Sequence, residues 1–160
     1  MSFSRVVVIA YGNPLRGDDG LAWRVAERLK KVFAPSDVEI LRQQQLVPEL
    51  AEPISRAKAV IFLDAAAQTT SFRSGDISIV EIGERETARA NESPLHHYFS
   101  PASLLALAQK LYGATPRAFV ATMKGQDFGP GEHLSALVER AIPEFLTRVE
   151  KLIRELATSG

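Results

Sequence analysis

Two short runs of consecutive apolar residues most limit what this chain can fold into. Residues 6–10 and 59–63 contain only aliphatic and aromatic side chains, without the polar alternation of a strand that has one face in water. Such runs are typical of strands inside a sheet covered on both faces. Neighbouring parallel strands must be joined by crossover connections, which are usually helices, so we expect helices between the runs.

Helical and strand patterns alternate along nearly the whole chain. Further strands are expected over 38–41, 77–82 and 117–123, and helices over 21–32, 48–57, from Ser100 to the capping Gly113, and 134–156 with a kink at Pro143. The polar segment 83–100 is expected to be a surface loop. The alternation predicts a three-layer α/β/α sandwich with a mainly parallel, twisted sheet of about five strands, similar to phosphorylase/hydrolase-like folds.

The composition fits one soluble domain and excludes several classes of function. The chain has 160 residues, an apolar fraction of 46% and a formal net charge of zero, so we expect a single domain over 1–160 that binds neither nucleic acid nor an anionic membrane. It has no cysteine, which excludes disulfides, thiolate ligands and thiol nucleophiles. No apolar run approaches the roughly 20 residues that span a bilayer, and we expect a cytoplasmic protein.

Three aspartates follow the two apolar strands. Asp18 and Asp19 stand in a glycine-rich turn before the first helix, where short acidic residues are also common as simple helix caps. Asp64 directly follows a buried strand, which helix capping does not explain. If the second strand lies outside the first and the third inside it, the first and third strands are neighbours. Asp19 and Asp64 then face one crevice at the carboxyl edge of the sheet.

The histidines are candidate metal ligands, although a histidine in a polar segment is as often simply solvated. His96 and His97 lie shortly before a helix whose N-terminus should reach the same sheet edge, whereas His133 follows a glycine-rich turn. Two carboxylates and one imidazole, with positions left for water or substrate, suit a borderline divalent ion such as nickel or zinc.

The segment 125–131, Gly-Gln-Asp-Phe-Gly-Pro-Gly, follows the last expected strand. It is either an ordinary glycine-rich turn or a flexible wall that lets an extended peptide approach. Two common motifs are missing. The turn at 12–20 lacks the lysine and hydroxyl of a nucleotide-binding phosphate loop, and no serine stands in the Gly-x-Ser-x-Gly elbow of serine hydrolases. Lys58 and Lys124 are expected to be solvated.

Together these motifs resemble those of the hydrogenase maturation proteases, which trim the carboxyl-terminal tail of nickel-iron hydrogenase large subunits. The resemblance begins with Gly-Asn-Pro-Leu-Arg-Gly-Asp-Asp-Gly at 12–20 and continues with Phe-Leu-Asp-Ala at 62–65. It includes His97, four residues before Pro101, and extends through the segments 111–113 and 127–135, so it covers nearly the whole chain.

The resemblance implies a nickel-dependent endopeptidase whose partner is the large-subunit precursor. Asp19, Asp64 and His97 would bind nickel, with His96 as the alternative because the histidine is doubled, and Asp19 and Asp64 would be catalytic. The nickel would be carried by the substrate, and zinc or cadmium could substitute in vitro. Ala22 stands where the family commonly has glycine, a change that a helix interior accepts. The predicted substrate-binding residues, in the two glycine-rich turns, are Gly12, Asn13, Asp18, Gly125 and Asp127.

Two other classes of protein share parts of this pattern. Peptidyl-tRNA hydrolases also have a strand followed by Gly-Asn-Pro, but they carry a histidine soon after it, whereas the first histidine here is His96. A non-enzymatic, flavodoxin-like binding module would use the same crevice for phosphate, which the pair Asp19 and Asp64 would repel.

Overall fold

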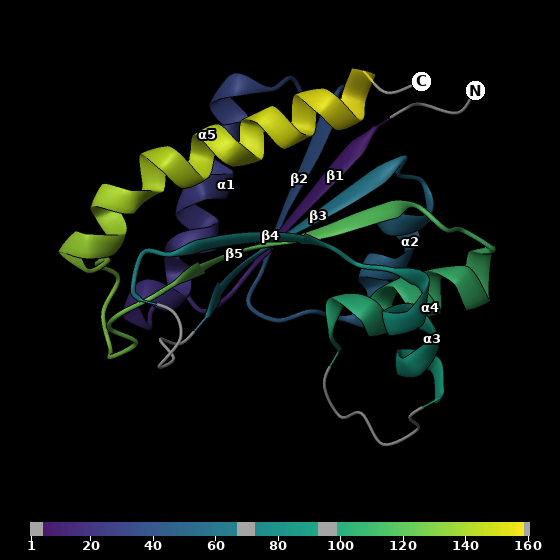
Figure 1. The fold of residues 1–160 in the computed structure, drawn as a ribbon, viewed down its shortest axis with the longest axis horizontal. Helices are drawn as coiled ribbons and strands as arrows, with labels where there is room; N and C mark the ends of the chain where they lie inside the picture. The colour runs from purple at the N-terminus through teal and green to yellow at the C-terminus, as the bar shows by residue number, and fades with distance from the viewer. Residues whose placement is uncertain (1–4, 67–72, 93–98, 159–160) are drawn as a thin grey trace.

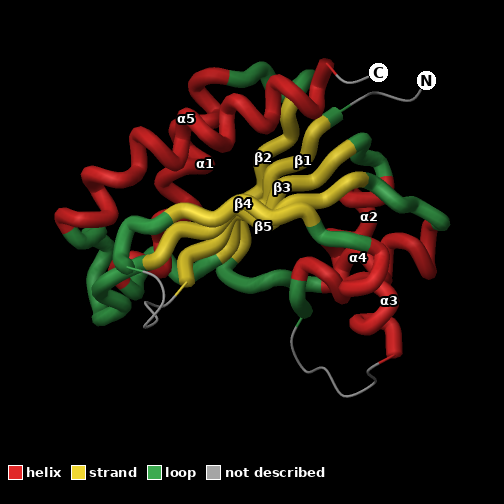
Figure 2. The backbone as a smooth tube through the Cα atoms, viewed as in Figure 1, coloured by secondary structure: helices red, strands yellow, loops and turns green. Residues whose placement is uncertain are grey.

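A computed structural model describes residues 5–66, 73–92 and 99–158 and shows a five-stranded sheet between two layers of helices (Figures 1 and 2). The strand order is β2-β1-β3-β5-β4, with β4 at one edge antiparallel to β5 and all other neighbours parallel. The strands are β1 (Val6–Tyr11), β2 (Val38–Gln43), β3 (Ala59–Ala66), β4 (Ile77–Glu81) and β5 (Arg117–Lys124).

Helices cover both faces of this sheet. On one face lie α1 (Leu21–Val32) and α5 (Ala136–Thr158), which continues through Pro143. On the other face lie α2 (Ala51–Ser55), preceded by the 3₁₀ helix η2 (Pro48–Leu50), and α4 (Pro101–Tyr112). The helix α3 (Glu84–Glu92) packs beside α4. The predicted three-layer sandwich with a mainly parallel sheet is confirmed.

The core consists of two apolar clusters, one on each face of the sheet. Val6, Val8 and Ala10 of β1 pack with α1 and α5, whereas Val7 and Ile9 pack with α2 and α4. Successive side chains of a strand point to opposite faces, so a strand covered twice needs an apolar residue at every position. This is why the apolar runs of β1 and β3 are continuous.

The helix α3 contradicts the predicted surface loop at 83–100 over residues 84–92, and residues 93–98 lie outside the described residues. Residues 84–90 are mostly good helix formers, but they offer no apolar stripe, and only Thr87 and Ala90 among them are half-buried. A search for apolar periodicity therefore missed the helix. None of the helices within the described ranges combines the length and apolarity needed to cross a membrane.

Candidate active site

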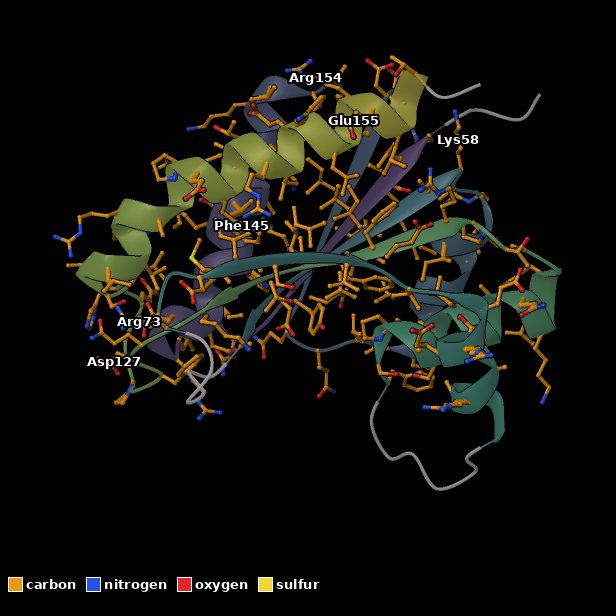
Figure 3. The ribbon with its side chains drawn as sticks, viewed as in Figure 1. Lys58, Arg73, Asp127, Phe145, Arg154 and Glu155 are labelled. Atoms are coloured by element: carbon orange, nitrogen blue, oxygen red, sulfur yellow. The ribbon has the colours of Figure 1, made fainter. Side chains whose placement is uncertain are left out.

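The carboxyl ends of β1 and β3 lie side by side, because these strands are neighbours in the middle of the sheet. Their register pairs Ala10 with Leu63, so Tyr11 and Asp64 are the next residues along the two strands. The predicted order, with the second strand outside the first and the third inside it, is confirmed. In Figure 3 the carboxyl edge carries Asp127, whereas Lys58, just before β3, marks the opposite edge.

The turn after β1 closes tightly on Asp19. The carboxylate Oδ2 of Asp19 accepts a hydrogen bond of 2.7 Å from the amide N–H of Asn13. Gly12 has a φ of +146°, and a Cβ atom at this position would clash with the carbonyl oxygen of Asp19. Neither the 3₁₀ helix η1 (Gly17–Gly20) nor α1 has a side-chain N-cap, so Asp19 orients the turn and is not a helix cap.

Asp64 is half-buried and electrostatically coupled to Asp19. Burial raises the pKa of the Asp64 carboxyl to about 6, and the negative charge of Asp19 adds to this rise. Hydrogen bonds from the Tyr11 hydroxyl and the Ala65 amide, and the positive charge of Lys124, act in the opposite direction. The two carboxylates predicted to share a crevice are therefore close enough to sense each other's charge.

Tyr11 and Lys124 are part of the same cluster, and the sequence interpretation missed both. Burial, together with the hydrogen bond to Asp64 and its charge, raises the pKa of the Tyr11 phenol far above its usual value. Lys58 and Lys124, both predicted to be solvated, are half-buried, and the positive charge of Lys124 also acts on Asp64. The signal for Tyr11 was its position at the end of the strand next to the one that carries Asp64.

Asp18 has a different environment from its neighbour Asp19. Its side chain is fully buried, and its carboxylate accepts four hydrogen bonds of 2.7–2.9 Å, from the amides of Gln126, Asp127 and Ser135 and from the Ser135 hydroxyl. Burial raises the pKa of Asp18, but these hydrogen bonds outweigh it and hold the pKa below its usual value. The contacts of Asp18 are thus internal, and a substrate could reach it only if the second turn moved.

The second turn, 125–131, is tied to the first by main-chain hydrogen bonds. The amide of Gly17 donates to Gly131, that of Asp18 to Asp127, and that of Gly131 to Leu15, all at 2.7–2.8 Å. A Cβ atom at Gly125 would lie 2.9 Å from the Cβ of Asp18. These bonds favour the interpretation of 125–131 as a fixed turn over that of a flexible wall.

The remaining predicted substrate-binding residues differ in their exposure. Gly12 and Gly125 are buried, Asn13 is half-buried, and Asp127 is exposed with its Oδ1 accepting from the amide of Gly129. Asn13 and Asp127 are therefore the two best placed to meet a ligand. Substrate binding by all five stays a prediction.

The metal-binding prediction depends in part on residues that the structure leaves undescribed. His96 and His97 lie outside the described residues, and His133 is exposed beside Gly131. Within 5–66, 73–92 and 99–158, no three His, Asp or Glu side chains form a group that could hold a metal ion. Metal binding by Asp19, Asp64 and His97, or alternatively His96, stays a prediction.

A pocket of about 630 Å³ lies away from these carboxylates, at the amino end of β5. Its walls come from the end of β4, from α3 and α4, and from the segment before β5, and they include Ile82, Thr87, Leu105 and Gln109. The side chains of Glu81 and Arg117 at its rim form an ion pair with two hydrogen bonds of 3.0 Å.

Comparison with known proteins identifies the fold. No family model matches the chain, and no curated protein matches it significantly. Among solved structures, the hydrogenase maturating endopeptidase HybD from E. coli matches with a TM-score of 0.74 at 24% identity, covering 94% of this chain and 93% of that one. The [NiFe] hydrogenase maturation protease HybD from Thermococcus kodakarensis matches with a TM-score of 0.73 at 19% identity, covering 93% and 99%.

A third match is the hydrogenase 2 maturation peptidase from Thaumarchaeota archaeon SCGC_AB-539-E09, with a TM-score of 0.68 at 22% identity over 93% of this chain and 97% of that one. The three matches cover 93–94% of the chain and not only a common sheet. The fold implied by the motif resemblance is therefore confirmed: the chain has the fold of the hydrogenase maturation proteases.

Proposed function

We propose that this protein is a cytoplasmic endopeptidase that removes the carboxyl-terminal tail of a nickel-iron hydrogenase large-subunit precursor after nickel has been inserted. The observation that carries the proposal is that Asp64, on β3, lies close enough to Asp19, in the turn after the neighbouring strand β1, for the charge of Asp19 to raise its pKa. The full-length fold match to maturation proteases supports it, and so do the motifs around both aspartates.

The side chains present fit nickel that arrives with the substrate. Carboxylate oxygen and imidazole nitrogen are suitable ligands for a borderline divalent ion, and Asp19, Asp64 and His97, or alternatively His96, would provide them. Asn13 orients the carboxylate of Asp19, while Tyr11 and Ala65 orient that of Asp64. A precursor without nickel would meet two like charges and no bridging cation, so only the loaded precursor would be held in place.

The reaction is the hydrolysis of one peptide bond. A water oxygen bonds to the scissile carbonyl carbon, the C–N bond breaks, and the departing nitrogen takes up a proton. Nickel in the precursor would polarise that carbonyl or lower the pKa of the water. An aspartate of the pair, positioned by its hydrogen bonds, could instead accept the proton of the water directly.

A cleavage assay with two forms of the precursor tests this proposal. The purified protein is mixed with nickel-loaded and nickel-free large-subunit precursor from the same source, and the tail is followed by mass spectrometry. We expect loss of the tail from the nickel-loaded form only. Cleavage of both forms would contradict recognition through nickel, and cleavage of neither, by folded protein, would contradict the proposed activity.

A further inference from the structure

The sheet face that carries Asp64 continues beyond β3 onto β5 and β4. The register pairs Asp64 with Thr122 and Thr122 with Ser78, so these three residues form one row across three strands. On the same face, the next row towards the amino end of β5 pairs Val120 with Val80. Directly paired residues of neighbouring strands present their side chains on the same face, so both rows share the face of Asp64.

This part of the face is incompletely covered. The Val80 side chain is 59% exposed, and Ser78, Val120 and Thr122 are half-buried. On the opposite face the neighbouring residues of β5, Ala121 and Met123, are fully buried in the cluster under α5. We call the four residues Ser78, Val80, Val120 and Thr122 the open face.

The open face leads from the carboxylate pair to the pocket at the amino end of β5. From Thr122 to Ala118 the strand advances about 13 Å at 3.3 Å per residue. There the amide of Ile82, which lines the pocket, donates a 2.8 Å hydrogen bond to Ala118. The pocket also contains Leu105 of α4, which belongs to the apolar cluster on the same side of the sheet.

We propose that the open face and this pocket bind the tail of the precursor as an extended peptide. The proposal rests on the function proposed above and adds the place where the departing segment lies. Three observations point to this occupant: the face adjoins Asp64, none of its four side chains is charged, and the distance of about 13 Å along β5 from Thr122 to the pocket matches about four residues of extended chain.

The two rows would contact different parts of the tail. The hydroxyls of Ser78 and Thr122, in the row of Asp64, can donate to or accept from the peptide main chain close to the cut. Val80 and Val120, in the next row, offer apolar contact to a side chain of the tail. The pocket receives residues farther from the scissile bond.

The substitution Val80→Arg tests the proposal, with Val32→Arg as the matched control. Val32 is also an exposed valine, 45% exposed, but it ends α1 on the opposite face of the sheet. We expect Val80→Arg to lower kcat/KM for the nickel-loaded precursor by about tenfold or more, as loss of a central apolar contact does at interfaces, and Val32→Arg to leave it unchanged. The unfolding temperatures of both variants are measured beside that of the wild type.

A photo-crosslinking residue placed at position 80 gives a second readout that does not depend on rate. We expect it to capture the tail segment of the precursor, identified by mass spectrometry, and not the mature subunit lacking the tail; the same residue at position 32 should capture neither. Wild-type cleavage together with unchanged kcat/KM in Val80→Arg and no captured tail would overturn this inference alone. Failure of the wild type to cleave any precursor would overturn the proposed function itself.

Discussion

Two adjacent aspartates in the first turn have separate roles, and the role of Asp18 is testable by stability. Its buried carboxylate accepts three amide hydrogen bonds and one hydroxyl hydrogen bond from the second turn. The side-chain amide of Asn would turn an N–H towards some of these donors. We expect Asp18→Asn to lower the free energy of unfolding by about 3 kcal/mol at pH 7, measured by urea denaturation.

The pH dependence of this loss has a definite sign. Because the pKa of Asp18 is lowered in the folded protein, its contribution to stability is complete above the unfolded value of about 3.9 and disappears as the pH falls through the folded value. The stability difference between wild type and Asp18→Asn should therefore shrink below about pH 4. A difference that stays constant as the pH falls would exclude the buried charge as its source.

Asp19 and Asp64 are expected to matter for processing and not for folding. We expect Asp19→Asn and Asp64→Asn each to lower processing by more than about 100-fold, since losing even an outer partner of a metal ligand lowers activity about 10–100-fold. Both residues are only half-buried at the ends of strands or turns, so the unfolding temperature should change little. A variant that fails to fold would show that its aspartate is structural.

The hydroxyl of Tyr11 influences the pKa of the Asp64 carboxyl. Burial raises the pKa of Asp64 to about 6, and the hydrogen bond from Tyr11 restrains that rise, so Tyr11→Phe should raise the pKa of Asp64 further. The measurement is a carbon-13 NMR titration of the Asp64 carboxyl in the isolated protein. Tyr112→Phe is the control, because Tyr112 is exposed on α4. Identical titrations in Tyr11→Phe and wild type would contradict the hydrogen bond.

At the scale of elements, the sequence predicts those that have a strong apolar signature and misses those that do not. The continuous apolar runs of β1 and β3 and the stripe of α1 predicted these elements, whereas the strand order was taken from the common doubly wound arrangement. The helix α3 was missed because its face carries no apolar stripe. The contact between the two turns was not predicted. The carboxylate of Asp18 accepts a hydrogen bond from the amide of Ser135, which is 117 residues away in the sequence, and no local pattern indicates such a pair.

Because the two turns are hydrogen-bonded to each other, alanine should destabilise the protein more at Gly17, inside the contact between the turns, than at Gly113. Gly17 and Gly113 both have positive φ, +55° and +70°, so alanine at either position brings backbone strain of about 1–2 kcal/mol. At Gly113 a Cβ meets nothing within 4 Å, whereas at Gly17 it would clash with the carbonyl oxygen of Asp127. That oxygen accepts the hydrogen bond from the Asp18 amide.

We therefore expect Gly17→Ala to cost about 1–3 kcal/mol more than Gly113→Ala in urea denaturation, the range typical of overpacking. Processing should also fall in Gly17→Ala, because the shifted turn carries Asp19, and should persist in Gly113→Ala. Equal losses of stability in the two variants would show that the turns do not depend on their close contact.

At the scale of the whole molecule, the fold persists where sequence similarity is low. The E. coli HybD structure is only 24% identical to this chain, although the match covers 94% of this chain. Apolar clusters on both faces of the sheet can be rebuilt from many combinations of residues of suitable volume. The site is different, because Gly12, Asp19 and Asp64 depend on particular side chains and on close main-chain approach. This contrast explains why short motifs, and not overall similarity, indicate the candidate site.

The last prediction concerns whether the isolated protein needs a metal ion for its stability. The fold is stabilised by its two apolar clusters, and nickel is proposed to arrive with the precursor. The isolated protein should therefore contain much less than one nickel per chain by elemental analysis, and a chelator should leave its unfolding temperature unchanged, since a ligand stabilises only while it is bound to the native state. Chelation of the nickel in the precursor should still abolish processing. Tightly retained, stoichiometric metal in the isolated protein, with a fall in unfolding temperature on its removal, would instead indicate a resident metal.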